Sequence, residues 1–191
     1  MKPASLRIFA IADVHSPASF RMAELAPADF DLVLTLGDID LDTLDYIQFK
    51  SRALPSFGVP GNHDPEDIPG LTSLHRTVVD FHGIKIGGFG GSPKYKDEPW
   101  HFTEKQVARA LKRMPAVDIF ISHAPPFATS ASEDRLHQGF HAFDAYIATH
   151  HPQFWIHGHL SKHCDAQVGA TKVLGVAEKS PLVLNFSWSH E

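Results

Sequence analysis

The stretch that decides the fold is Leu6-Arg7-Ile8-Phe9-Ala10-Ile11-Ala12, followed at once by Asp13-Val14-His15. The apolar run is short, so it predicts a buried β-strand that ends at Asp13. Asp13 and His15 stand two residues apart at the strand end, where both side chains can point toward one place. The stretch therefore predicts a core strand with polar chemistry at its carboxyl end.

The same arrangement recurs in the first third of the chain. Strand-like runs at 31–36 and 56–59 lead into Gly37-Asp38 and into Gly61-Asn62-His63-Asp64. Segments 19–26 and 42–54 are predicted to be helices, the second one amphipathic. Alternation of strands and helices favours a parallel sheet with crossover helices. Such sheets place their sites at the carboxyl ends of the strands.

The remaining chain continues the α/β pattern. Strand-like runs flank a predicted tight turn at His82-Gly83, and Thr103 with Gln106 predicts a capping box that opens a helix at 103–114. The other predicted elements are strands at 117–122, 154–156, 171–176 and 182–188, and a helix at 140–150. No repeat or linker divides the sequence, so we expect a single domain over residues 1–191.

Composition excludes several functional classes. The chain has 191 residues, 43% of them apolar, and a formal net charge of −5, so a nucleic-acid partner is not expected. Cys164 is the only cysteine, which excludes an intrachain disulfide and a thiolate metal cage. No signal peptide or membrane span is predicted, so a cytoplasmic location without a membrane partner is expected. The oligomeric state is left open.

The polar residues that follow the apolar runs share one chemistry. Carboxylates, an amide and imidazoles suit borderline divalent metals, with manganese favoured and iron, zinc, nickel or magnesium as alternatives. Each motif alone is also typical of an ordinary turn, although Gly61-Asn62-His63-Asp64 is more specific than the others. Together they predict a centre of two divalent metal ions, built from Asp13, His15, Asp38, Asn62, His123 and His159.

The ordered set resembles the calcineurin-like metallophosphoesterase superfamily. That family has the pattern D-x-H, GD, GNH(D/E), H and GHxH, and this chain supplies matching residues from Asp13 to Ser161. The resemblance implies an α/β fold, a four-layer αββα sandwich of two mixed sheets flanked by helices. It also implies hydrolysis of a small phosphoester by a hydroxide that the two metals activate.

The resemblance also assigns roles to individual residues. Asp38 would bridge the two ions, and His63 would be a catalytic histidine that does not bind metal. His63 would stabilise the transition state or protonate the leaving group, and Asp64 would orient its ring. The first ion would be held by Asp13, His15 and Asp38, and the second by Asp38, Asn62, His123 and His159.

One position departs from the family pattern. Ser161 stands where the final histidine of GHxH would complete the first metal site. Water or His163 could fill that position. Alternatively, His157 and His159 could form a shifted pair, which makes His157 a reserve ligand, although a packing role for His157 is preferred.

Several functions remain open at this point. A phosphodiesterase is favoured, because small members without extra domains resemble diesterases of broad range. The missing histidine suggests a phosphomonoesterase or protein phosphatase, but no Arg-Gly follows Asp42 as that branch requires. A non-catalytic interaction scaffold, like the retromer subunit of this fold, is the third interpretation. The retained His15, His63, His123 and His159 argue for an enzyme.

Two loops are candidates for substrate contact. The stretch 87–101 carries Lys94, Tyr95, Lys96 and Trp100, which could meet a phosphate and stack on a base. The stretch 124–139, with Asp134 and His137, follows His123 directly and could form a pocket wall. Both are equally typical of packed surface loops.

Overall fold

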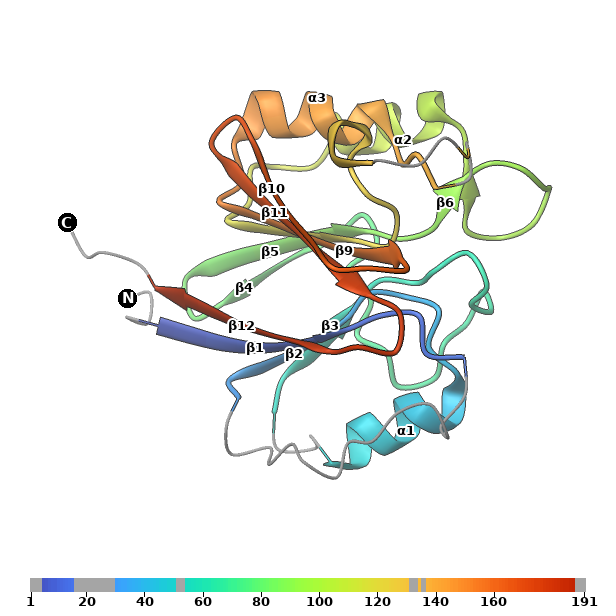
Figure 1. Cartoon of the computed structure of the whole chain (residues 1–191), viewed down its shortest axis with the longest axis vertical. Coiled ribbons are helices and arrows are strands. Elements are labelled where there is room, and N and C mark those ends of the chain that lie inside the picture. The colour runs from blue at the N-terminus through green and yellow to red at the C-terminus, as the bar shows by residue number, and fades with distance from the viewer. Residues whose placement is uncertain (1–4, 16–29, 51–53, 131–133, 135–136, 188–191) are drawn as a thin grey trace.

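Two β-sheets lie face to face between helices in the computed structural model, which describes residues 5–15, 30–50, 54–130, 134 and 137–187. Figure 1 shows α1 (Leu41–Lys50) outside one sheet, and α2 (Glu104–Leu111) and α3 (His141–His150) outside the other. This is the predicted four-layer αββα arrangement of two mixed sheets. The helix predicted at 19–26 lies outside the described residues.

The first sheet has the order β12-β1-β2-β3. The strands β1 (Ser5–Ile11), β2 (Leu32–Thr35) and β3 (Ser56–Gly58) run parallel, and β12 (Leu182–Ser187) pairs antiparallel with β1. All four residues of β2 are buried, as a strand covered on both faces requires. The parallel sheet predicted for the first third of the chain is confirmed.

The second sheet has the order β10-β11-β9-β8-β5-β4. Four of its strands are parallel and its two edge strands, β4 and β10, pair antiparallel with their neighbours. The strand bounds are β4 Val78–Phe81, β5 Ile84–Phe89, β8 Ile119–Ser122, β9 Phe154–Leu160, β10 Cys164–Val168 and β11 Thr171–Ala177. His82 and Gly83 join β4 to β5 with φ angles of 53° and 84°, as the predicted tight hairpin needs.

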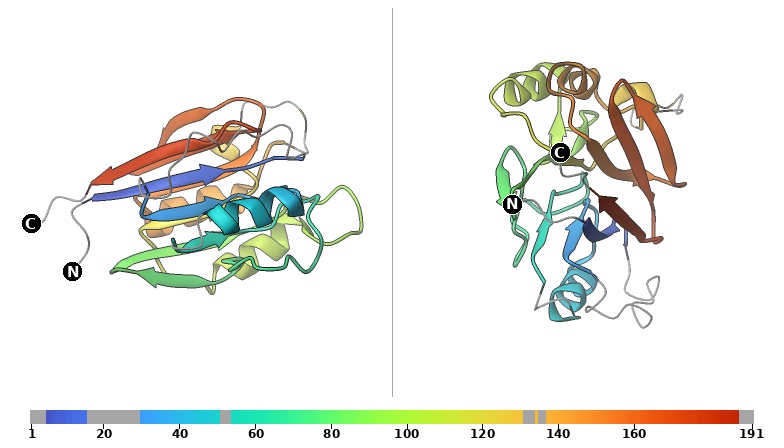
Figure 2. Two further views of the ribbon diagram at one scale, coloured as in Figure 1. Left: turned by 90° about the horizontal axis from the view of Figure 1, so that it is seen from below. Right: turned by 90° about the vertical axis from the view of Figure 1, so that its left-hand side faces the viewer.

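Three apolar clusters fill the spaces between the layers. The largest lies between the sheets, a second lies under α2 and α3, and a third lies under α1. In the second cluster, the fully buried Trp155 stacks on Phe120 with ring centroids 4.1 Å apart. The two views in Figure 2 show the same succession of layers. None of the described helices is long and apolar enough to span a membrane.

The observed elements differ from the predicted ones in a few places. The first helix is described over Leu41–Lys50, and Leu54, where the predicted helix ended, lies in a bend and packs against the cluster under α1. Strand β9 continues through the His157-Gly158-His159 motif. Strand β10, a short pair β6 (Ser92–Pro93) and β7 (His101–Phe102), and a 3-10 turn η4 (Phe127–Thr129) were not predicted. The capping box of Thr103 and Gln106 at the start of α2 is present.

Candidate metal centre

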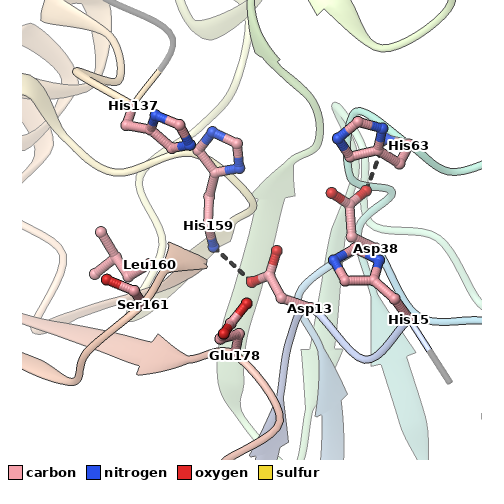
Figure 3. A pocket seen from close by; sticks show the side chains of 9 residues that line it. All are labelled: Asp13, His15, Asp38, His63, His137, His159, Leu160, Ser161 and Glu178. Atoms are coloured by element: carbon pink, nitrogen blue, oxygen red, sulfur yellow. Dashed lines mark hydrogen bonds between the residues drawn. The ribbon is translucent and has the colours of Figure 1, made fainter. Parts of the chain in front are cut away.

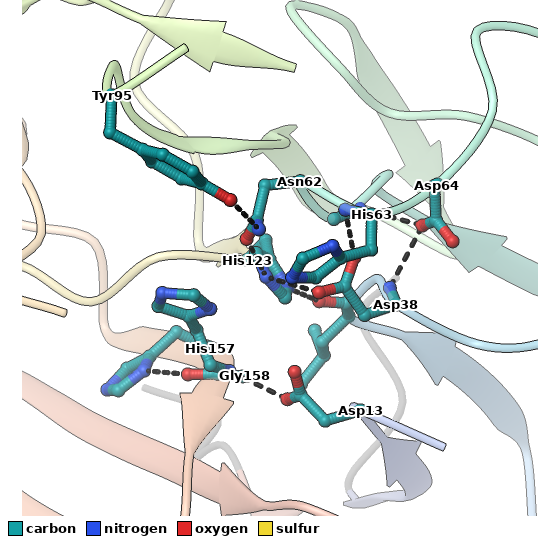
Figure 4. A network of polar contacts seen from close by, with 12 residues as sticks. Asp13, Asp38, Asn62, His63, Asp64, Tyr95, His123, His157 and Gly158 are labelled. Atoms are coloured by element: carbon teal, nitrogen blue, oxygen red, sulfur yellow. Dashed lines mark hydrogen bonds and ion pairs between the residues drawn. The ribbon is translucent and has the colours of Figure 1, made fainter. Parts of the chain in front are cut away.

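Four predicted residues from both sheets meet at one edge of the sandwich. Asp13 follows β1, Asp38 follows β2, His123 follows β8 and His159 lies near the end of β9. Each offers one ligand atom, and these four atoms lie within 4.8 Å of one another. Figure 4 shows Asp13, Asp38 and His123 converging from the ends of different strands. Imidazoles and carboxylates at this spacing fit a divalent metal site.

Three residues of this cluster have an unusual backbone. The φ angles of Asp13, Asp38 and His159 are 54°, 55° and 59°. Side-chain-bearing residues rarely adopt this left-handed conformation, which costs on the order of 1–3 kcal/mol each. The surrounding strand ends therefore hold these residues in place against local strain, as is typical of functional sites.

Two glycines allow the strand ends to approach closely. A Cβ atom on Gly61 would lie 2.0 Å from Asp38 Oδ1, and one on Gly37 would lie 2.3 Å from the Gly61 backbone nitrogen. Gly37 also has a φ of 91°. The Gly-Asp and Gly-Asn-His-Asp turns therefore pack against each other in a way that larger residues would prevent.

His123 shows why the cluster suits a cation. Its Nδ1 lies 2.8 Å from the Leu36 carbonyl oxygen, which can only accept, so Nδ1 carries a proton. Its Nε2 lies 3.0 Å from Asn62 Oδ1 and 3.3 Å from Asp38 Oδ2, which are both acceptors. Burial alone would lower the pKa of His123, but Asp38 and Asp13 raise it to about 9. Without a metal, a proton on His123 Nε2 satisfies the two oxygens that face it. A metal ion in the same place would be bound by those oxygens and by Nε2.

The two carboxylates differ in their titration. Burial raises the pKa of Asp13 to about 6, although His123 and the His159 backbone N–H, which donates to Asp13 Oδ2 at 2.8 Å, favour the charged form. Burial also disfavours the charged form of Asp38, but His123 outweighs it and holds the Asp38 pKa well below its usual range. The centre of the cluster therefore has an ionised carboxylate at Asp38.

The Gly61-Asn62-His63-Asp64 turn is tied directly to Asp38. The His63 backbone N–H donates to Asp38 Oδ1 at 2.8 Å. Asp64 Oδ2 accepts backbone N–H groups from Asp38 at 2.9 Å and Gly61 at 2.7 Å. Among the described residues the hydrogen bonds of the Asp64 carboxylate run to these two amides and not to the His63 ring. Asp64 thus holds the turn, which differs from the ring-orienting role expected from the sequence.

His15 and His63 lie at the mouth of the site rather than in its buried part. Both are exposed, and their ring centroids are 6.2 Å apart. They line a cavity of about 490 Å³, which Figure 3 shows together with Asp13 and Asp38. His15 therefore shares the cavity with the cluster, although it lies outside the four-residue group.

His157, the predicted reserve ligand, is not part of the cluster. Its ring is fully buried, its Nδ1 bonds the Gly158 carbonyl oxygen at 2.9 Å, and burial lowers its pKa to about 4. The register of β9 against β11 shifts between His157 and Leu160, at the left-handed His159. In a regular strand, His157 and His159 would point to the same face. The irregularity breaks this alternation, so the His159 side chain points into the cluster and the His157 side chain does not.

The cavity also contains residues outside the predicted ligand set, one of them from the loop at 124–139 that was expected as a possible pocket wall. The exposed His137 stacks on His159 with ring centroids 4.7 Å apart, and its Nδ1 lies 2.9 Å from Asp134 Oδ2. Glu178, just after β11, lines the same cavity beside Ser161. The loop that carries His137 follows His123 directly in the sequence, which was a weak indication that it borders the site. Nothing in the sequence indicated Glu178.

The loop at 94–100 reaches the site through Tyr95. The Asn62 amide nitrogen donates to the Tyr95 hydroxyl at 3.5 Å, and Tyr95 is 43% exposed. Lys94 and Lys96 pair with carboxylates of the same loop at 2.7 and 2.6 Å. The Trp100 indole N–H donates to a backbone carbonyl oxygen at 2.8 Å. Tyr95 is therefore the member of this loop that borders the site.

Comparison with solved structures identifies relatives of the fold. The protein TT1561 of Thermus thermophilus has a TM-score of 0.68 and 20% identity, covering 95% of this chain and 98% of that one. The phosphopantetheinyl hydrolase of Mycobacterium tuberculosis has a TM-score of 0.64 and 14% identity, covering 92% and 91%. Vacuolar protein sorting 29 of Cryptosporidium parvum has a TM-score of 0.52 and 14% identity, covering 93% and 77%.

Sequence comparison adds a family. A search of curated proteins finds no match. Residues 6–162, which contain all the predicted site residues, match the calcineurin-like phosphoesterase family. With the two-sheet fold and the Asp–His cluster at its edge, this match shows that the chain belongs to the calcineurin-like phosphoesterase family.

Proposed function

We propose that this chain is a metal-dependent hydrolase that cleaves a small phosphodiester. The observation that carries the proposal is the group of Asp13, Asp38, His123 and His159, whose ligand atoms lie within 4.8 Å of one another beside an open cavity. The mixture of carboxylates and imidazoles favours manganese among the borderline divalent ions. Membership of a phosphoesterase family supports the reaction class.

Two ions are proposed, and Asp38 is shared between them. Its central place, with hydrogen bonds to the His63 amide and a contact to His123, supports this role. When bound, the ions would supply Lewis acidity and lower the pKa of a water molecule at the site. The proposed holders are Asp13, His15 and Asp38 for the first ion, and Asp38, Asn62, His123 and His159 for the second.

His63 is proposed to act on the substrate directly. Its backbone is fixed by the hydrogen bond to Asp38, while its ring is exposed at the mouth of the cavity. A histidine there can donate a proton to the leaving oxygen or stabilise negative charge that develops on the phosphoryl group. Asp64 supports this placement by holding the turn through the Asp38 and Gly61 amides.

The charge of the cavity favours a diester over a monoester. Among the residues that the structure describes, no lysine or arginine lines this cavity. A phosphomonoester carries about 1.5 to 2 negative charges near neutral pH and is usually met by basic side chains, whereas a diester carries a single charge. The exposed Tyr95 beside Asn62 offers a face on which an aromatic leaving group can stack.

A scaffold of the same fold is the alternative of a different class. The fold of vacuolar protein sorting 29 resembles that of this chain. Against a scaffold role stand the three strained ligand positions, since Asp13, Asp38 and His159 keep left-handed backbones that a binding surface elsewhere does not need.

Turnover of paired chromogenic substrates tests the proposal. Metal-stripped protein would be titrated with manganese, nickel, zinc, iron and magnesium, using bis-p-nitrophenyl phosphate and p-nitrophenyl phosphate. Metal-restored cleavage with preference for the diester is the expected result. Preference for the monoester would replace the diesterase with a phosphatase. Folded protein without turnover under any metal would favour the scaffold.

A further inference from the structure

The residue that follows β9 is Ser161, so this position offers the first ion no imidazole. Ser161, which lines the cavity beside Leu160, has a neutral hydroxyl, a weaker ligand for a divalent ion than an imidazole or a carboxylate. Without a further ligand, the first ion would depend on Asp13, His15 and Asp38 alone. Any replacement has to come from a residue that lies near Ser161.

His163 is held elsewhere. Its Nδ1 accepts the backbone N–H of Ala177 at 3.2 Å, and its Nε2 lies 3.2 Å from the Ser180 hydroxyl. It lines a different cavity, together with Cys164. These contacts leave His163 unsuited to the position of the missing histidine.

The neighbouring strand brings Glu178 beside Ser161. Strands β9 and β11 run parallel, Ala177 is paired with Leu160, and the Glu178 backbone N–H donates to the Leu160 carbonyl oxygen at 2.9 Å. Glu178 therefore stands next to Ser161 one position further along, at the usual strand separation of about 4.8 Å. A glutamate side chain is long enough to span that separation.

The surroundings of Glu178 leave its carboxylate available. Its side chain is 47% exposed, and its nearest ion-pair partner among the described residues is the adjacent Lys179, with Nζ 3.9 Å from Oε1. Figure 3 shows the carboxylate turned toward the cavity that Asp13 and Ser161 also line. No stronger interaction among those residues competes for it.

We propose that Glu178 is a ligand of the first ion, in the place of the histidine that Ser161 replaces. This inference rests on the proposed function, since it assumes the two-ion centre. The first ion would then be held by the carboxylates of Asp13, Asp38 and Glu178 with the imidazole of His15. Exchange of an imidazole for a carboxylate favours manganese or magnesium over zinc at that position.

The test is calorimetric titration of metal-stripped protein with Mn²⁺, which needs no turnover. Glu178→Gln keeps the size of the side chain and removes its charge, so the fold should be preserved. The expected result is one Mn²⁺ bound about 10-fold or more weakly while the other is unchanged. Lys179→Gln, which alters the adjacent exposed side chain, is the matched control and should bind both ions as the wild type does.

A second variant tests the replacement itself. Glu178→Ala combined with Ser161→His should restore two tight sites and shift the first toward Zn²⁺. If the wild type binds two ions and Glu178→Gln binds both with unchanged affinity, the proposed role of Glu178 is wrong and the two-ion centre stands. Wild-type protein that binds no Mn²⁺ would overturn the proposed function and this inference with it.

Discussion

Gly61 is the position at which the proposed centre has least room. A Cβ atom added there would lie 2.0 Å from Asp38 Oδ1 and 2.5 Å from the Asp38 backbone nitrogen. Both Asp38 atoms are already fixed, because Oδ1 accepts the His63 N–H and the nitrogen donates to Asp64. Gly61→Ala must therefore push the turn and the Asp38 carboxylate apart.

The size of the effect follows from these contacts. Adding a methyl group to a well-packed site costs about 1–3 kcal/mol. A displaced hydrogen bond to a carboxylate adds about 1.5–3 kcal/mol. We expect Gly61→Ala to lower the free energy of unfolding by about 3 kcal/mol or more. Both ions should bind about 10–100-fold more weakly, since the displaced carboxylate is the one they share.

Urea unfolding of the metal-free protein and Mn²⁺ calorimetry measure the two effects. Gly169→Ala is the control, because Gly169 has a φ of 58° but nothing within 4 Å of its added Cβ. It should cost only the left-handed strain, about 1–2 kcal/mol, and leave Mn²⁺ binding unchanged. If Gly61→Ala were no more destabilising than Gly169→Ala and bound Mn²⁺ normally, the close packing of this turn would not be what positions Asp38.

Three further predictions concern the same centre. Asp38→Asn should weaken both Mn²⁺ ions together in calorimetry, and loss of only one ion would exclude a bridging role. His63→Ala should slow diester turnover by about 10²–10⁴-fold at full metal content measured by atomic absorption, and normal turnover would exclude its assigned part in catalysis. The raised pKa values, about 6 for Asp13 and about 9 for His123, mean that the folded metal-free protein binds extra protons. Its stability should therefore fall as the pH rises between 6.5 and about 9, where His123 loses its proton, while Mn²⁺ binding tightens as it displaces that proton. Below pH 6.5 the raised pKa of Asp13 is opposed by the lowered pKa values of His75 and His157, so the test is confined to the higher range. Urea unfolding and calorimetry across this range measure both trends, and flat profiles would contradict the assignment.

The sequence predicts those parts of the molecule whose signal is local. β1 and β2 are recognisable because their apolar runs are buried and end in polar motifs. β10 was missed because its residues are alternately half-buried and exposed at a sheet edge, so its apolar signal is weak. The capping box of α2 needs only Thr103 and Gln106, three residues apart.

The same distinction holds for the site. Asp13, Asp38 and His123 each directly follow an apolar run or its glycine, so their meeting at one edge could be anticipated. Glu178 could not, because its place beside Ser161 depends on the pairing of β9 with β11 and on the irregularity at His159. The hydrogen bonds of Asp64 depend on how two turns pack against each other, which no local pattern encodes.

The distribution of the cluster over both sheets has a mechanical consequence. Asp38 follows a strand of one sheet, whereas His123 follows and His159 lies in strands of the other, so the proposed second ion would cross-link the two layers at this edge. Because residues more than a hundred positions apart must come together first, such an ion would be captured late in folding, after the layers have docked. Chelation would then speed amide hydrogen exchange at the carboxyl ends of β2 and β8 while leaving the opposite edge of the sandwich protected.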